Sequence, residues 1–175
     1  MVGRVIVGAV LVGGLVGGAT ARERGDVAAP KPTTAQEAIV VAVVVDPATR
    51  QPAVVLEGSR DHRRFAMAIG LAEATGIALP LQGVTPPRPL THDLFLTMFG
   101  RLKVSLSRVT IDDFRDDTYF ATVHLVVNGT AMTLDSRPSD AIALAIRAKA
   151  PVLVEDRVFE RGSPRTAPDE RRQRI

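Results

Sequence analysis

The stretch D-S-R-P-S-D-A-I-A-L-A-I-R-A, residues 135–148, decides the fold, because a short charged turn opens directly into an almost wholly apolar helix. Pro138 suits the first turn of a helix, where its missing N–H is not needed. Asp140 places a negative charge near the positive end of the helix dipole. From Ala141 onward the helix has no polar face, so we expect the rest of the fold to cover it on most sides.

Length and composition limit the classes of protein and site that the chain can form. Its 175 residues suit one domain with terminal extensions. The chain has no cysteine, which excludes a disulfide framework, a thiolate zinc site and a cysteine nucleophile. The formal net charge is +3, and the five arginines of residues 161–175, set against Asp169 and Glu170, also give 5 − 2 = +3. The rest of the chain is therefore electrically neutral, which gives only weak support for an extended groove that binds nucleic acid.

The N-terminal residues 1–21 have the pattern of an export signal. Arg4 supplies a positive start, residues 5–19 form an uncharged apolar run, and residues 19–21 have the small-x-small form of a cleavage site. An uncleaved membrane anchor is the alternative, but a spanning helix needs about 20 apolar residues. This run is shorter and contains five glycines. We therefore predict cleavage, a flexible leader at 22–37, and a periplasmic or secreted mature protein with no stable membrane span.

The folded domain is expected at residues 38–160, followed by an Arg-rich disordered tail at 161–175. The pattern of alternating and β-branched residues predicts strands at Ile39–Val45, Ala53–Glu57, Phe65–Ile69, Lys103–Ile111, Thr118–Val127 and Val152–Val154, with the chain treated as tail from Phe159. Helices are predicted at Leu71–Leu79, at His92–Arg101 and from Pro138 onward. The fold class is a single α+β domain with a mixed or antiparallel sheet and helices packed on it.

Several local features follow from individual residues. The β-branched run at 39–45 suits a central strand covered on both faces. Pro80 cannot donate a hydrogen bond to the carbonyl of Gly76, so the helix there should end or kink. Thr91 is expected to cap the next helix with its side chain. Residues 112–117 read as a charged turn.

The Asn128-Gly129 dipeptide is the strongest hairpin signal in the chain, because both residues tolerate the positive φ of a type I′ turn. It also predicts the pairing of the two strands that it joins. Pairing Val127 with Thr130 places the residue pairs Leu125 and Met132, and Val123 and Leu134, on one apolar face, while His124 and Thr133 face the other side.

Four segments of the chain carry a family resemblance: I-G-x-x-E-A-x-x-I-A at 69–78, G-V-T-P-P-R-P-L-T-H-D at 83–93, I-D-D at 111–113 and D-S-R-P-S-D-A-I-A-L-A at 135–145. In this order they resemble the bifunctional nuclease family, whose domain is often called BFN. The resemblance covers about residues 38–160. It implies an α+β domain that self-associates, and a nuclease activity on both DNA and RNA reported for some members.

The resemblance also supplies candidate site residues from two of these segments. Hydrolysis of a phosphodiester requires an activated water, a metal or general base, and cationic help for the charge on phosphorus. The candidates for catalysis are His92, Asp93, Arg137 and Asp140, the candidate ligands of a divalent metal such as Mg²⁺ are Asp93, Asp135 and Asp140, and Glu73 and Asp112 are outlying carboxylates. The substrate implied is a nucleic acid.

A second interpretation of the same residues is structural. Asp135 and Asp140 could cap a buried helix while Arg137 pairs with either, which would leave a non-catalytic exported binding or assembly module. The two hypotheses differ in geometry, because the nuclease requires His92, Asp93 and Asp140 to converge in a cleft. The apolar helix from Pro138 also predicts a homo-oligomer with part of this layer near the interface, because a small domain offers little to cover it.

Overall fold

The computed structural model describes residues 34–47 and 49–162, and the predicted export signal, most of the leader and most of the Arg-rich tail lie outside them. In this part of the chain seven strands form one mixed sheet in the order β3-β2-β1-β7-β4-β5-β6. The strands are β1 (Gln36–Val45), β2 (Pro52–Gly58), β3 (Arg64–Ala68), β4 (Val104–Arg115), β5 (Thr118–Val127), β6 (Thr130–Ser136) and β7 (Val152–Val154). The helices are α1 (Leu71–Leu81), α2 (Thr91–Arg101), α3 (Pro138–Ala148) and α4 (Asp156–Gly162). The predicted α+β fold class is confirmed.

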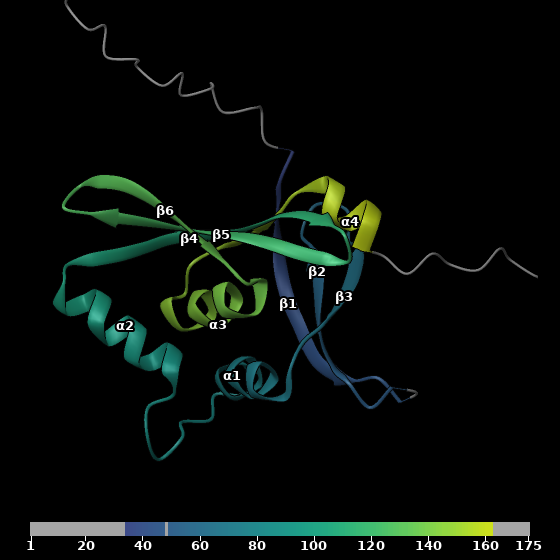
Figure 1. Ribbon diagram of the computed structural model, residues 1–175, viewed down its shortest axis with the longest axis horizontal. Coiled ribbons are helices and arrows are strands. Elements are labelled where there is room, and N and C mark those ends of the chain that lie inside the picture. The colour runs from purple at the N-terminus through teal and green to yellow at the C-terminus, as the bar shows by residue number, and fades with distance from the viewer. Residues whose placement is uncertain (1–33, 48, 163–175) are drawn as a thin grey trace, which may run out of the picture. The chain divides into compact units, whose positions relative to one another are not determined.

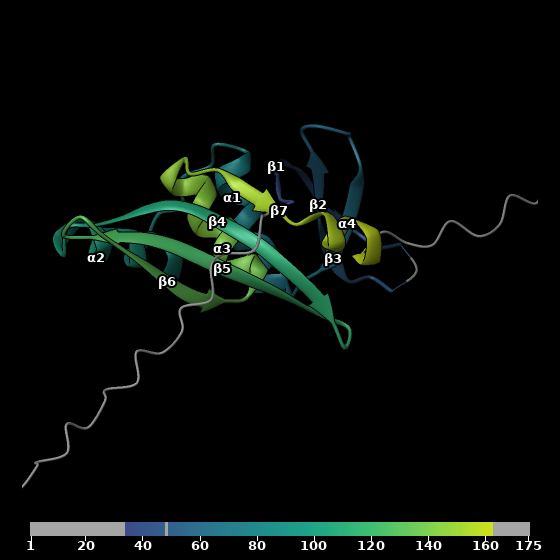
Figure 2. The same ribbon diagram turned by 90° about the horizontal axis from the view of Figure 1, so that it is seen from above.

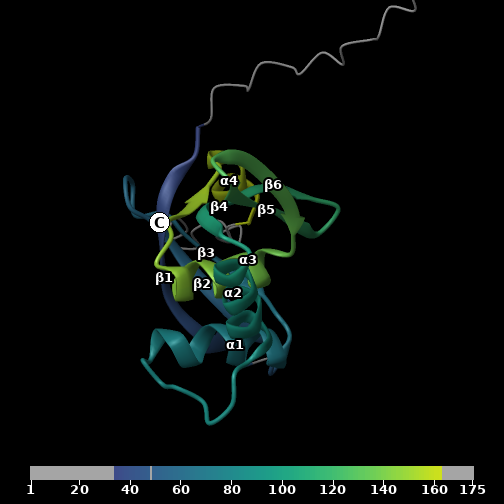
Figure 3. The same cartoon turned by 90° about the vertical axis from the view of Figure 1, so that its left-hand side faces the viewer.

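The sheet consists of two antiparallel parts that meet at a short contact. Strands β4, β5 and β6 form a meander, and β7 runs parallel to β4. Strand β1 joins β7 only through Gln36 and Glu37, and it otherwise pairs with β2 (Figure 3). Figure 1 shows α1, α2 and α3 on one side of the β4–β6 meander, with α3 nearest the middle.

The predicted central helix is confirmed, and it is covered within the chain. Ala141, Ile142, Ala143 and Ala145 have no exposed surface. Strands β4 and β5 and helices α1 and α2 all contact α3. The expectation that α3 needs a partner subunit to cover it is therefore wrong, because the sheet and two helices of the same chain suffice.

Strand β1 differs from the prediction that both of its faces are covered. Ile39 and Val45 are each 59% exposed, and Val41 and Val44 are also exposed. A register shift lies between Val40 and Ala42. The β-branched run predicted a strand correctly, but such a run does not reveal whether a second layer covers it.

The β4–β5 hairpin extends further than the sequence suggested. Residues 112–115 continue β4 and pair with β5 as far as Arg115 opposite Thr118, and the turn is confined to Asp116 and Asp117, which both have positive φ (Figure 2). Residues 112–115 were therefore wrongly assigned to the turn, because the end of a long hairpin tolerates charge, whereas Asp116 and Asp117 form a turn as predicted. The hairpin at Asn128-Gly129 has the predicted register throughout and positive φ at both residues.

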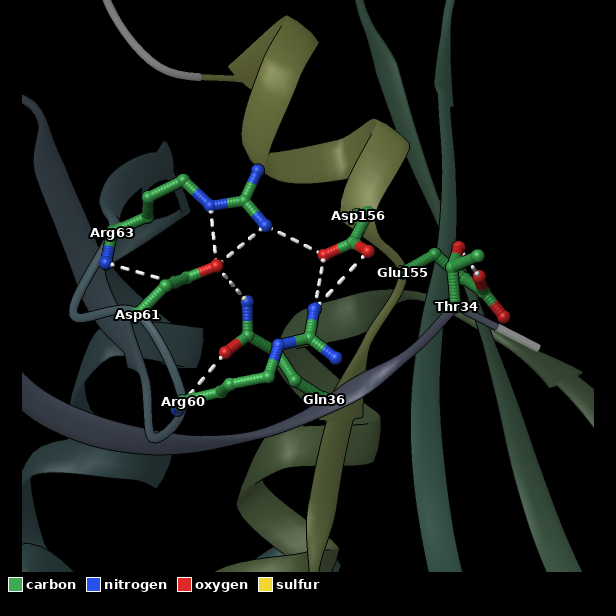
Figure 4. Close-up of polar contacts among 7 residues, drawn as sticks. All are labelled: Thr34, Gln36, Arg60, Asp61, Arg63, Glu155 and Asp156. Atoms are coloured by element: carbon green, nitrogen blue, oxygen red, sulfur yellow. Dashed lines mark hydrogen bonds and ion pairs between the residues drawn. The ribbon is translucent and has the colours of Figure 1, made fainter.

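The last described helix, α4, was missed. Val158 and Phe159 are buried, and the Phe159 ring packs edge-on against Phe65 with centroids 5.3 Å apart. The assignment of Phe159 to a tail is thus wrong. A polar cluster fixes α4 to the strands (Figure 4): Asp61 accepts hydrogen bonds from Gln36 and Arg63, and Asp156 accepts from Arg63 at 2.6 Å and from Arg60 at 2.9 Å.

Candidate functional site

Two of the segments that carry the family resemblance meet at one contact between α2 and α3. His92 lies in the first turn of α2, and Asp140 lies in the first turn of α3. The His92 Nε2 atom is 3.2 Å from Asp140 Oδ1. Residues 48 positions apart in the sequence therefore share a site, which meets the requirement of the nuclease hypothesis for His92 and Asp140 but not for Asp93.

Arg137 extends this contact into a row of alternating charges. Its Nε lies 2.7 Å from Asp140 Oδ2, and its Nη2 lies 3.2 Å from Asp140 Oδ1. Its Nη1 lies 2.9 Å from Glu73 Oε1 on α1. The four residues His92, Asp140, Arg137 and Glu73, called the charged row below, come from three helices. Glu73, an outlying carboxylate in the sequence, thus belongs to the site.

The contact with Asp140 defines the hydrogen-bonding role of the His92 ring. A carboxylate only accepts hydrogen bonds, so the contact with Asp140 requires the hydrogen of His92 on Nε2. Nδ1 is buried and has no hydrogen-bond partner among the described residues. A hydrogen on Nδ1 would be a buried donor without an acceptor. Nε2 is therefore the ring atom through which His92 acts on Asp140.

Gly76 of α1 makes room for this ring. A Cβ atom at position 76 would lie 3.1 Å from His92 Cε1 and 3.3 Å from His92 Nδ1. Such distances are shorter than ordinary van der Waals contacts, so a larger residue would push the imidazole. A glycine in the middle of a helix costs up to about 1 kcal/mol relative to alanine, and its close approach to His92 accounts for it here.

The charged row keeps Asp140 ionised. Burial acts to raise the pKa of Asp140, but hydrogen bonds from Arg137 and His92 outweigh it and hold that pKa below its ordinary value. The hydrogen bonds to Asp140 and Glu73 raise the pKa of Arg137. Both groups are thus charged at neutral pH.

The hydrogen bonds within the charged row leave some donor and acceptor positions of its side chains unused. A guanidinium carries five N–H donors, and Arg137 uses three of them, so two remain on a side chain that is 66% exposed. A carboxylate has about four lone-pair positions, and Asp140 accepts three N–H bonds in this row. One acceptor position therefore remains, on Oδ2. Chemically, the row can bind an anion through Arg137 and a water through Asp140.

Asp93 does not join the charged row, although it follows His92 directly. Its Oδ2 accepts the Leu90 N–H at 2.8 Å, and its Oδ1 accepts from Arg147 Nε at 2.7 Å. Burial acts to raise the pKa of Asp93, and these hydrogen bonds hold it below the ordinary value. Helix α2 begins at Thr91, so its N-cap is Leu90 rather than the predicted Thr91, and Asp93 satisfies the Leu90 N–H.

Arg147 was missed in the sequence and connects all three helices. Its Nη1 donates to the carbonyl of Gly76 on α1 at 2.7 Å and to that of Ala143 on α3 at 2.9 Å. The Gly76 carbonyl is the acceptor that Pro80 leaves without an N–H. Because Arg147 supplies one, α1 continues through Pro80 to Leu81, slightly beyond the predicted end. The only sign of this interaction in the sequence was Pro80, four residues after Gly76, because it leaves the Gly76 carbonyl without a helical N–H partner.

Asp135 and Asp112 lie apart from the row. Asp135 is near the end of β6, beside Leu134, which pairs with the buried Val123 on the core face. Neighbouring strand residues face opposite sides, so Asp135 belongs to the other face of the sheet, although it borders a pocket that His92 lines. Asp112 accepts a hydrogen bond from Thr122 at 2.6 Å on the neighbouring strand.

The donor set does not fit the predicted metal site. Within residues 34–47 and 49–162, no three or more histidine and acidic side chains are grouped to hold a metal ion. Arg137 occupies both oxygens of Asp140 and lies between that carboxylate and Glu73. A divalent cation would have to displace the guanidinium or bind beside its positive charge. Asp93, Asp135 and Asp140 thus face three different surroundings.

Two pockets open on either side of the charged row. One has a volume of about 570 Å³ and an apolar wall that includes Phe95, Phe99 and Leu144. The other has a volume of about 390 Å³ and lies against α1. Thr91, His92, Arg137 and Asp140 line both pockets, so the row forms a ridge between two hollows.

Comparison with known proteins places the chain in a family. The model of the bifunctional nuclease domain matches residues 54–166, which include every residue of the charged row. The chain belongs to the bifunctional nuclease domain family. The family membership confirms the resemblance found in the sequence. No helix in the described part of this family member is long and apolar enough to cross a membrane.

Relatives of this bifunctional nuclease domain protein include uncharacterised proteins and proteins named bifunctional nuclease. An uncharacterised protein of Mycobacterium tuberculosis strain H37Rv is 38% identical over 123 residues, which cover 70% of this chain and 73% of the relative. Bifunctional nuclease 1 of Oryza sativa subsp. indica is 30% identical over 111 residues, which cover 61% of this chain and 33% of that protein. The match thus spans one third of the rice protein.

Proposed function

We propose that this protein hydrolyses phosphodiester bonds in DNA, RNA or both, and that the charged row is its active site. The observation that carries the proposal is the convergence of His92, Arg137 and Asp140 from two family segments at 2.7–3.2 Å. Family membership and the relatives named bifunctional nuclease support it.

Arg137 is proposed to bind the scissile phosphate. Its two uncommitted N–H donors lie on an exposed guanidinium, and Glu73 and Asp140 hold that guanidinium from the other side. A guanidinium matches two phosphate oxygens in a bidentate manner and stabilises the negative charge that grows on them.

Asp140 is proposed to activate the attacking water. Its remaining acceptor position on Oδ2 lies beside the Arg137 guanidinium, so a water there is next to the bound phosphate. The water oxygen forms the new bond to phosphorus, Asp140 takes its proton, and the bond from phosphorus to the leaving oxygen breaks, with that oxygen taking a proton from solvent. His92 donates its Nε2–H to Asp140 and orients it.

A second function has a specific observation in its favour. Every charged group of the row is already paired within the chain, and a carboxylate with a lowered pKa is a weaker base. These features suit a lock between α1, α2 and α3 in a non-catalytic binding or assembly module. The nuclease is preferred because the hydrogen bonds of the row leave two N–H donors of the exposed Arg137 side chain and one acceptor position of Asp140 unused.

The test is a cleavage assay with purified mature protein on labelled single-stranded DNA and single-stranded RNA, run with Mg²⁺ and with chelator. The proposal expects cleavage that co-elutes with the protein. Because the donor set does not fit a metal, cleavage is expected to persist in chelator; loss of cleavage there would contradict the metal-free step and support the Mg²⁺ dependence predicted from the sequence. Absence of cleavage of either substrate in both conditions would favour the binding module.

We also propose that the protein acts outside the cytoplasm. The support is the signal pattern of residues 1–21. N-terminal sequencing of the protein from cell fractions tests it: a start at Arg22 in the periplasm or medium is expected, and an intact Met1 in the cytosol would reject it.

A further inference from the structure

A third pocket, of about 440 Å³, lies beside the charged row and has no part in the mechanism above. The end of α1 and the connector to α2 form its wall, and the apolar lining residues include Pro80 of α1 and Val84, Pro86 and Pro89 of the connector. Two polar residues, Asp93 and Arg147, also line it. The pocket thus combines stiff apolar walls with one ion pair.

Arg147 presents an uncommitted donor there. Its side chain is only 8% exposed, and Nε and Nη1 make hydrogen bonds to Asp93, Gly76 and Ala143. Nη2 has no hydrogen-bond partner in the described part of the chain, yet it is not among the fully buried polar atoms without a partner. Arg147, a lining residue of the pocket, therefore keeps a donor that no other group in the described part of the chain uses.

Asp93 presents acceptors beside this donor. Each of its oxygens accepts one N–H bond, so each retains a lone pair. The side chain is 34% exposed. Because Asp93 neutralises Arg147, the pocket lacks the net positive charge that would capture a free phosphate. What it offers is a donor next to an acceptor between apolar walls.

We infer that this pocket binds one nucleobase of a single-stranded nucleic acid whose phosphate lies at Arg137. A nucleobase has two flat apolar faces, which can pack against the proline-rich walls of the pocket. Purine edges that show an acceptor beside a donor, such as N7 and the N6 amino group of adenine, complement Arg147 Nη2 and Asp93. A base can enter only when it is unstacked, which favours single strands.

The position of the pocket agrees with this role, which rests on the proposed function. Asp93 directly follows His92 in α2, and Arg147 lies seven residues after Asp140 in α3. Seven residues of helix span about 10 Å, which is within the reach of one or two nucleotides from a phosphate held at Arg137.

The experiment measures binding of a fluorescent single-stranded oligonucleotide and of a series in which one position at a time lacks its base. All proteins carry Asp140→Asn to prevent cleavage. Val84→Trp fills the pocket, and Thr85→Trp is a second blocking variant at a lining residue. Leu81→Trp is the matched control, because Leu81 is similarly exposed, 38% against 47% for Val84, and does not line the pocket.

The inference expects one abasic position to weaken binding about tenfold, as the loss of a stacked base does. Val84→Trp or Thr85→Trp should weaken binding of the intact strand by the same factor, and the abasic position should then have no further effect. Leu81→Trp should leave both the affinity for the intact strand and the effect of the abasic position unchanged. Binding without any position dependence, or blocking variants that bind like the control, would overturn the inference and leave the nuclease proposal standing. If no oligonucleotide binds at all, both proposals fail.

Discussion

Arg147 donates a hydrogen bond of 2.7 Å to the carbonyl oxygen of Gly76, two helices and 71 residues away. This bond replaces the one that Pro80 cannot make, and it keeps α1 intact where Gly76 packs against His92. The Arg147–Asp93 ion pair fixes α2 to the same point. The charged row is therefore supported by a buried guanidinium that makes no hydrogen bond to any of its four members.

Replacement of Arg147 tests this support. Arg147→Met should destabilise the protein by about 3 kcal/mol, because it leaves Asp93 and two carbonyls without their partner. Pro80→Ala restores an N–H for the Gly76 carbonyl, so it should recover about 1 kcal/mol in the Arg147→Met background. Urea unfolding of the two single variants and the double variant measures the coupling. Strictly additive effects would contradict the link between Pro80 and Arg147.

Gly76→Ala tests the contact with His92. The new methyl group would lie 3.1 Å from the ring, so the imidazole must shift and its hydrogen bond to Asp140 should weaken. Cleavage should fall about tenfold or more, as loss of an oriented hydrogen bond does. Gly100→Ala is the matched control, because nothing lies within 4 Å of that Cβ in α2, and it should stabilise by up to about 1 kcal/mol. Equal activity of both variants would contradict the account.

The sequence predicted the features that depend on local patterns. The register at Asn128-Gly129 and the helix from Pro138 follow from turn chemistry and periodicity, and both are confirmed. The exposure of β1, the burial of Phe159 and the reach of Arg147 depend on elements far away in the chain. Of the predicted site, His92, Arg137 and Asp140 converge, whereas Asp93 pairs with Arg147, because adjacent residues on a helix point about 100° apart.

Acid should loosen α4 through Asp61. Hydrogen bonds from Arg63 outweigh burial and, with those from Gln36, hold the pKa of Asp61 well below the ordinary value of about 3.9. The stability that ionised Asp61 contributes is thus fully present when the pH is above the ordinary pKa. It is lost as the pH falls through the lower pKa of Asp61 in the folded protein. Melting temperatures measured between pH 5 and 2 should fall less steeply in Asp61→Asn than in the wild type. Parallel curves would show that Asp61 does not couple to folding.

Self-association stays a prediction, with α2 in place of α3 as the expected surface. Leu94 and Met98 of α2 and Leu102 directly after it are exposed, and contiguous exposed apolar residues mark interaction sites. Light scattering of the mature chain at micromolar concentration should give more than the monomer mass. Leu94→Glu with Met98→Lys should return the monomer, and Thr97→Glu on the same helix is the matched control. A monomeric wild type would reject the prediction.

The most direct test of the active-site proposal is the rate of cleavage of single-stranded DNA and RNA by Asp140→Asn, beside a thermal melt. Asparagine keeps the shape of the side chain but cannot take the proton of water, so the rate should fall at least about 100-fold. Asp112→Asn is the matched control, because Asp112 bonds Thr122 away from the charged row, and it should cleave like the wild type. Loss of cleavage with a melting temperature close to that of the wild type is the predicted result. Wild-type cleavage rates in Asp140→Asn would contradict the account.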